Sequence, residues 1–329
     1  MGFFRRSDRN APHYAPPPGP PPPSSRARYA PPPGLPPGRI PSYSPPPDPP
    51  PKPKRSAAPP RWAPAPEISE ASEQDFEAGV AFCDAYPLDQ PKLISSAAVE
   101  RIHERGCGAW GLVKPAHHHF SGLVNGDNKS GLAGSWRVVT DKTCKDSCIT
   151  SDLPVVGALY EHRGKRGIYF EVRINKMEGT IAVGTACKPY PEFRLPGWNR
   201  QSAGFHLDDM RKFFEDADGG RDYAPHLSVH PGCTVGCGYD FSTGVIFFTF
   251  NGERLPDAFR GLYLPRSACD VYAAIGVEGV NDLEVNFGTA TFIWKEGNEW
   301  AWRVEGHVGQ TIAGTSYLGE ELPAYSKHG

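Results

Sequence analysis

The sequence lacks any apolar run approaching the roughly 20 residues that a helix needs to cross a bilayer. It also lacks a signal peptide, because Met-Gly-Phe-Phe-Arg-Arg at the start is followed by prolines and not by an apolar core. We therefore expect a cytoplasmic chain whose contact with membranes is at most peripheral. The eight cysteines of such a chain should be reduced thiols.

Signatures of catalysis are missing as well. The sequence contains no Gly-x-Ser-x-Gly elbow, no Walker loop and no His-Glu-x-x-His pair. Glycosidases need two carboxylates that flank one bond, yet Glu171 and Glu284 each stand alone among apolar neighbours. We therefore predict no catalytic residues, no cofactor and no enzymatic activity.

Cysteine and histidine clusters are present, but their spacing does not favour a metal. Structural zinc sites usually use two close ligand pairs at coordinated spacing. Cys144 and Cys148 form one loose pair, and in the other pair Cys237 lies inside an apolar strand pattern. The three adjacent histidines at 117–119 could not all face one ion from a strand. We therefore predict no metal site.

Proline and charge are distributed unevenly along the chain. Residues 1–66 contain 25 of the 37 prolines, with ten Lys/Arg against two Asp/Glu. A segment so rich in proline stays solvated and cannot bury a core, so residues 1–66 should form a disordered basic arm. The body is correspondingly acidic. No nucleic-acid-binding motif accompanies the basic charge, so we expect no nucleic-acid partner.

The rest of the chain divides into three segments. Residues 67–106 should form a helical lead-in, with one helix at 75–85 and another that Ser95 or Ser96 caps and Gly106 ends. From 107 to 305 apolar and β-branched residues alternate, and Asn251-Gly252 predicts a type I′ hairpin turn. This pattern predicts an all-β antiparallel sandwich. Residues 306–329 should form a flexible tail. The strands are expected at 136–140, 168–174, 180–186, 234–239, 245–250, 271–277 and 283–287.

Several blocks of this body resemble the SPRY domain. They are Tyr-Phe-Glu-Val at 169–172, Leu-Pro-Gly-Trp at 195–198, Gly-Phe-His-Leu-Asp-Asp at 204–209, the hairpin from 235 through Asn251-Gly252, and Val-Asn-Phe-Gly at 285–288. Lys-Pro-Tyr at 188–190 and Phe-Arg-Leu-Pro-Gly-Trp at 193–198 are most similar to fungal SPRY adaptors of WW-domain (HECT-type) ubiquitin ligases. The resemblance implies a SPRY-type sandwich that recognises a client protein with surface loops, and sorting of membrane proteins at endosomes.

Two departures from that family stand out. Yeast members carry a membrane-spanning helix ahead of the SPRY domain, whereas this sequence contains none. The glycine that commonly follows the paired aspartates is Met210 here. The first departure puts endosomal residence in question, and the second puts the conformation of that loop in question.

The resemblance places the client-binding surface on the loops around Tyr190, Arg194, Trp198, His206, Asp208 and Asp209. An exposed aromatic side chain beside charged groups is typical of a peptide-binding hot spot. Structural roles remain as alternatives. Trp198 follows Pro-Gly and could fill the core, and Asp208 could cap a turn.

Two short motifs could bind partner domains. Leu322, Pro323 and Tyr325 form a Leu-Pro-x-Tyr ligand for a WW domain. Pro50, Pro53 and Arg55 fit an SH3 groove, although a proline-rich spacer would contain this pattern by chance. The first hypothesis is thus an adaptor between a client and a WW-domain ubiquitin ligase. The alternative is a scaffold whose arm binds SH3 or other signalling partners without a ligase.

Overall fold

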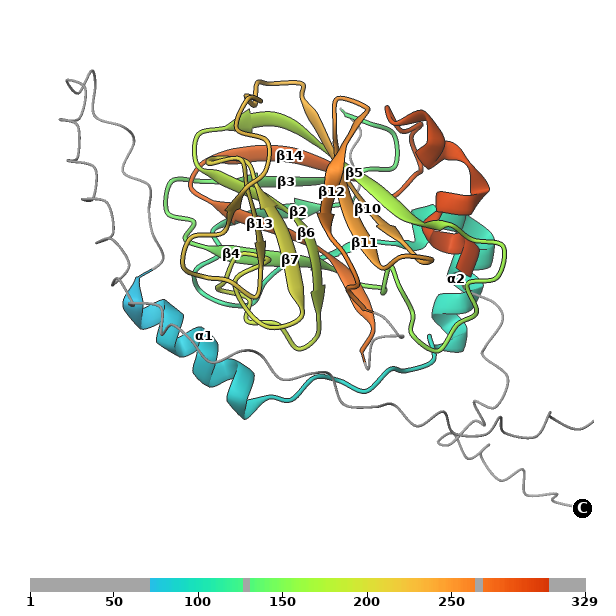
Figure 1. Cartoon of the computed structure of the whole chain (residues 1–329), viewed down its shortest axis with the longest axis horizontal. Helices are drawn as coiled ribbons and strands as arrows, with labels where there is room; N and C mark the ends of the chain where they lie inside the picture. The colour runs from blue at the N-terminus through green and yellow to red at the C-terminus, as the bar shows by residue number, and fades with distance from the viewer. Residues whose placement is uncertain (1–71, 127–130, 264–268, 308–329) are drawn as a thin grey trace, which may run out of the picture. The chain divides into compact units, whose positions relative to one another are not determined.

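The computed structural model describes residues 72–126, 131–263 and 269–307 (Figure 1). The proline-rich arm with its SH3-type motif lies outside these residues. So does the tail from residue 308 onward, which carries Leu322, Pro323 and Tyr325.

Two helices precede the sheets. Helix α1 spans Glu73–Ala85, and the hydroxyl of Ser72 caps it by accepting from the amide of Asp75. Helix α2 spans Ser96–Arg105, with Ser95 as its cap and Gly106 in a positive-φ conformation at its end. Both expected helices are therefore confirmed. In Figure 1, α2 lies beside the C-terminal segment, with which the turn after it makes contacts.

The body is a sandwich of two seven-stranded antiparallel sheets, as the sequence predicts. All seven expected strands are present. Seven further strands were not in that list: six of them have five residues or fewer, and β12 contains proline and charged residues. The first sheet, in spatial order, comprises β1 (Leu112–Val113), β4 (Ser147–Ser151), β13 (Val271–Glu278), β6 (Thr180–Cys187), β7 (Ser202–His206), β8 (Arg211–Phe214) and β9 (Arg221–Asp222). The second comprises β12 (Glu253–Phe259), β11 (Val245–Phe250), β10 (Thr234–Asp240), β5 (Gly167–Met177), β14 (Asn281–Asn286), β3 (Trp136–Thr140) and β2 (Gly122–Asn125).

Strand β5 shows how the core is organised. Ile168, Phe170 and Val172 alternate along it and pack between the sheets with no exposed surface. Tyr169 points to the opposite face, where it packs with Phe247 and the C-terminal tryptophans in a second apolar cluster. Both faces of this strand are thus buried.

The second cluster explains the isolated glutamate of β5. The carboxylate of Glu171 accepts hydrogen bonds from the backbone amides of Ile293 and Trp294, each at 3.0 Å, and from the hydroxyl of Tyr169 at 2.9 Å. It therefore holds residues 293 and 294 on the outer face of the sheet, just before the C-terminal turns η2 (Lys295–Asn298), η3 (Trp300–Trp302) and η4 (Val304–His307). Its isolation in the sequence reflects this role as an anchor.

The hairpin between β11 and β12 has the predicted turn. Asn251 and Gly252 have φ values of 50° and 83°. Positive φ at both central positions is what a type I′ turn requires, and it brings Phe250 opposite Glu253.

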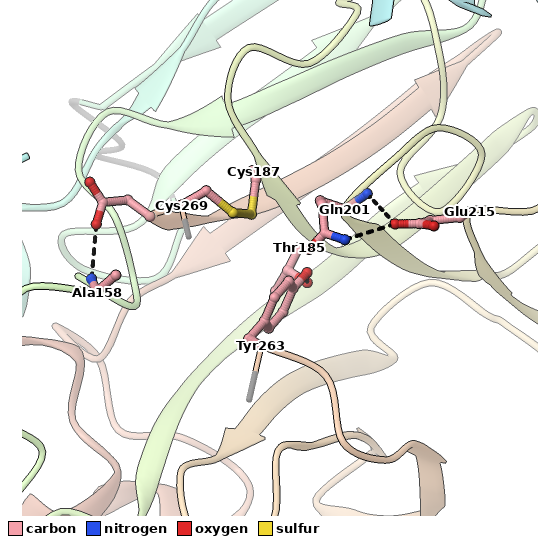
Figure 2. Close-up of a disulfide and its surroundings, with 8 residues drawn as sticks. Ala158, Thr185, Cys187, Gln201, Glu215, Tyr263 and Cys269 are labelled. Carbon is pink, nitrogen blue, oxygen red and sulfur yellow. Dashed lines mark hydrogen bonds between the residues drawn. A yellow bond between two sulfur atoms is a disulfide. The ribbon is translucent and has the colours of Figure 1, made fainter. Parts of the chain in front are cut away.

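The expectation that all eight cysteines are thiols is wrong in this structure. Cys187, at the end of β6, is joined to Cys269 by a disulfide (Figure 2). Next to this bond, the carboxylate of Asp270 accepts from the amide of Ala158 at 2.9 Å. A sequence argument from the missing export signal could not anticipate the pairing, because the two cysteines are 82 positions apart and meet only when β6 pairs with β13.

Candidate functional site

A cavity of about 820 Å³ opens at one rim of the sandwich, and we call it the rim cavity. It is bounded by the start of α1, the loop before β7, the turn between β7 and β8, and the segment after β8. Of the six residues expected to bind a client, five line it: Arg194, Trp198, His206, Asp208 and Asp209. The other residues that line it are Glu73, Phe76, Thr180, Leu195, Arg211, Phe213, Ala217, Asp218, Gly219 and Asp222.

Arg194 lies at the base of the rim cavity and is 1% exposed. Its Nε donates to the side-chain oxygen of Asn199 at 3.1 Å, and its guanidinium lies 4.4 Å from the centre of the Trp198 ring. Its Nη1 is buried and makes no hydrogen bond to any described residue. Burial lowers the pKa of Arg194 from its ordinary value. The cation is thus held mainly by an aromatic face and one amide.

His206 is also buried rather than part of an exposed surface. Its Nε2 donates to the carbonyl of Pro196 at 2.9 Å, and its ring stacks on Phe213 at 4.0 Å. Burial lowers the pKa of His206 to about 4, so the ring is neutral near pH 7. His206 therefore shapes the cavity wall and holds the loop before β7 in place.

The sequence left open whether Trp198 fills the core or contacts a ligand. Its side chain is half-buried and does part of both. One side of the ring covers Arg194, and Trp198 also lines the open cavity. It is therefore the predicted aromatic residue that a ligand in this cavity could reach.

The paired aspartates differ in their surroundings. Asp209 caps the turn, because its carboxylate accepts from the backbone amide of Arg211 at 2.9 Å. Asp208 is exposed as a residue, yet crowding of its carboxylate and then the charge of Asp209 raise its pKa to about 6. Met210 adopts the positive φ of 58° that its glycine counterpart would adopt without strain. The loop thus keeps a left-handed turn despite the substitution.

Tyr190 lies elsewhere, and its expected place on an exposed surface is wrong. It is 6% exposed, and its hydroxyl donates to the carbonyl of Leu195 at 2.6 Å. It borders a second cavity of about 660 Å³ with Lys188, Glu192 and Phe193. Tyr190 thus stabilises the loop that carries Arg194 and Trp198, because its hydroxyl hydrogen-bonds to a carbonyl of that loop.

Helix α1 contributes residues that sequence reasoning assigned to a lead-in. Glu73 and Phe76 line the rim cavity, and Phe76 is 44% exposed. The sequence held one signal for this role, because Phe76 is an aromatic residue on a helix that has no continuous apolar face. In the structure Gly79 is the one buried residue among the 13 of α1. The helix meets the body mainly through polar groups, and we call this region of contact the α1 seam. The α1 seam comprises Asp75, Gly79, His119, Asp146 and Arg194.

The rim cavity is predominantly acidic. Five carboxylates line it, against the two arginines Arg194 and Arg211. Arg211 is already engaged, since its Nε donates to Asp222 at 3.0 Å and its Nη1 to the carbonyl of Gly219 at 2.8 Å. The excess of carboxylates fits recognition of a positively charged segment.

Comparison with known proteins identifies the family of the domain that carries the rim cavity. Residues 167–290 match the model of the SPRY domain. The chain is a SPRY-domain protein. It is 30% identical over 258 residues to a protein called ssh4 from Sclerotinia sclerotiorum, covering 78% of this chain and 45% of that one. A SPRY domain-containing protein from Schizosaccharomyces pombe is 28% identical over 220 residues, which are 66% of this chain and 50% of that protein.

The chain spans about half the length of these curated relatives. A crystal structure of a human SPRY domain matches 54% of this chain and 96% of its own, with 24% identity and a TM-score of 0.39. SPRY domains bind protein partners. Membership of this family therefore indicates that the sandwich binds a protein. Neither helix within residues 72–126, 131–263 and 269–307 has the length and apolar character to span a bilayer.

Proposed function

We propose that this SPRY-domain protein is a non-catalytic adaptor. The rim cavity binds a segment of a client protein, and Leu322, Pro323 and Tyr325 recruit a WW-domain ubiquitin ligase. The outcome is ubiquitin-dependent sorting of membrane proteins, by a cytoplasmic protein that meets endosomal membranes peripherally. Joining the two binding sites in one chain raises the concentration of ligase near the client.

The observation that carries the first half is the convergence of Arg194, Trp198, Asp208 and Asp209 on one cavity. Phe76 and Trp198 offer aromatic surface, and the carboxylates around them offer charge. An aromatic anchor inside a polar border is the usual composition of a peptide-binding hot spot. The excess of carboxylates selects a client segment that carries lysine or arginine.

A peptide-display selection tests the client site. A random peptide library is panned against residues 72–307, and the affinities of the recovered peptides are measured at low and high salt. We expect sequences rich in Lys and Arg, whose affinity falls with salt because exposed charges are screened. Asp208→Lys should weaken them at least about tenfold, since it places like charges together. The matched control Glu253→Lys alters an exposed carboxylate on β12 and should leave the affinity unchanged. Equal loss in both variants, or selection of acidic peptides, would refute the acidic client site.

The ligase half rests on the sequence of the tail and on the resemblance to fungal SPRY adaptors. Proline fixes an extended backbone that docks into the aromatic groove of a WW domain at a small entropic cost. Binding of the intact chain to isolated WW domains should be lost in Tyr325→Ala and retained in Tyr317→Ala, which changes another tyrosine of the same tail. If the intact chain binds no WW domain above background, the ligase half fails and the client site still stands.

The alternative function is a scaffold whose arm binds SH3 or other signalling partners through Pro50, Pro53 and Arg55. Deleting residues 1–66 should then abolish partner capture, whereas deleting 306–329 should not. The adaptor predicts the reverse for a WW-domain ligase.

A further inference from the structure

The three histidines at 117–119 do not lie on a strand, so the premise behind the predicted absence of a metal site is wrong. They occupy a turn after β1, and their rings gather on one side of it. One ring nitrogen from each histidine lies within 4.8 Å of the others. A turn can direct adjacent side chains to one point, whereas a strand would send them to alternate faces.

A fourth donor comes from α1. The Nε2 of His119 lies 3.9 Å from a carboxylate oxygen of Asp75. This contact links residues 44 positions apart and places a carboxylate beside the histidine cluster. On the other side, the carboxylate of Glu192 accepts from the amides of Ala116 and His117 at 2.7 and 2.9 Å. Glu192 therefore holds the turn in the shape that brings the rings together.

The hydrogen bonding of the rings leaves donors for a ligand. His119 is 5% exposed, and its Nδ1 is buried without a hydrogen-bond partner of ordinary length. His117 Nδ1 accepts one long contact, 3.3 Å from the amide of His119. An ion shared with Asp75 would bind Nε2 of His119, the ring nitrogen that faces that carboxylate.

We propose that His117, His118 and His119, completed by Asp75 of α1, bind a divalent transition metal of the zinc class. Imidazole suits Zn²⁺, Co²⁺, Ni²⁺ and Cu²⁺, and three histidines with one carboxylate can fill a tetrahedral shell. Zinc–nitrogen bonds of about 2.0–2.1 Å put neighbouring donors roughly 3.4 Å apart. His118 is exposed and His117 half-exposed, so rotation of these two rings can close the remaining gap. Coordination through Nδ1 of His117 would replace its long backbone contact.

The ion would also act on the rim cavity. Asp75 is two residues from Glu73 and one from Phe76, both of which line that cavity. Gly79 is the one buried residue of α1, so apart from the edge-on contact of Phe82 with Phe193 the helix has little apolar contact to hold it on the body. A metal that joins Asp75 to the histidine turn therefore fixes one wall of the client site.

Metal titration of the full chain, purified without a polyhistidine tag and stripped with a chelator, tests the proposal. Calorimetry should show one equivalent of Zn²⁺ bound, and Co²⁺ should give the visible absorption of a tetrahedral site. His118→Ala removes an exposed ligand without touching the core and should weaken Zn²⁺ binding by about 100-fold. Asp75→Asn should weaken it by at least about 10-fold, because it removes the one charged ligand of the shell. His103→Ala, on the exposed face of α2, is the matched control and should bind like the unaltered chain.

Hydrogen exchange reads the consequence for α1. Zn²⁺ should slow exchange of the amides of Glu73–Ala85 in the unaltered chain and not in Asp75→Asn. Failure of the unaltered chain to bind Zn²⁺ or Co²⁺ would overturn the site, and so would binding that His118→Ala leaves intact. Binding through the thiols is one such result, and Cys83→Ser would identify it, because Cys83 is the half-exposed free cysteine among the described residues. Binding without slower exchange in α1 would overturn the part assigned to Asp75.

Discussion

The core between the two sheets and the α1 seam are built from opposite materials. The core is apolar, and Ile168, Phe170 and Val172 have no exposed surface there. In the α1 seam, Asp75 and Gly79 of the helix face a histidine, an aspartate and an arginine of the body, and the helix has no other buried residue. Apolar burial provides most of the free energy of folding, whereas buried polar groups provide little and are costly when unpaired. The core therefore holds the fold, and the α1 seam is the region where a ligand can change the structure at small cost.

The largest expected effect separates the two regions directly. Phe170→Ala removes a ring that is 0% exposed and should lower the free energy of unfolding by about 3–5 kcal/mol. Phe76→Ala, on the exposed side of α1, should change it by less than about 1 kcal/mol. Urea denaturation of both variants checks this. A similar loss in the two would mean that α1 is part of the core.

The disulfide gives the next largest effect. Replacing Cys187 and Cys269 by serine removes a cross-link that closes a loop of 82 positions. The free energy of unfolding should fall by about 2–4 kcal/mol under non-reducing conditions. With dithiothreitol present, the unaltered chain should unfold like the double variant. Thiol titration of unreduced, denatured protein should find six free cysteines, and a count of eight would contradict the bond.

The pH dependence tests the α1 seam. Burial, and next the charge of Glu278, raise the pKa of Asp146 from about 3.8 to about 7. The folded state then holds a proton on Asp146 that the unfolded state has released, so the contribution of Asp146 to stability falls as pH rises from about 4 to about 7. Asp146→Asn cannot ionise, and above pH 7 it should be more stable than the unaltered chain by on the order of 2–4 kcal/mol. Urea denaturation at pH 5 and pH 8 measures this, with the exposed Asp84→Asn as control.

A substitution at Gly79 should have the smallest effect on overall stability and the clearest effect on amide exchange in α1. A Cβ on Gly79 would lie 3.1 Å from the side chain of Asn199 and 3.2 Å from that of Arg194. Gly79→Leu should therefore lift the helix while changing the free energy of unfolding by less than about 1 kcal/mol, since Leu favours helix. Amide exchange in α1 should accelerate at least about tenfold. Ala78→Leu, one position away and exposed, should leave exchange unchanged. Unchanged exchange in both variants would show that α1 is held by contacts other than the α1 seam.

Local patterns in the sequence predicted those features whose causes are local. The alternation of apolar residues around Phe170 predicts a buried strand, Ser95 predicts a helix start, and Asn251-Gly252 predicts its turn from backbone sterics alone. Part of the candidate site followed as well, because Arg194, Trp198 and Asp208 lie in blocks that resemble a known family. The sequence did not predict Phe76 as part of the site, because its place on the rim depends on where α1 docks.

Alternating apolar side chains are a local pattern, and they were enough to predict an antiparallel sandwich because each strand must bury one face. Which distant groups meet depends on how the finished elements pack. The pairing of β6 with β13 brings Cys187 to Cys269, and the docking of α1 brings Asp75 to His119 and Phe76 to the cavity. These contacts join residues far apart in the chain, and no local periodicity encodes them, since they arise when separately formed elements pack together.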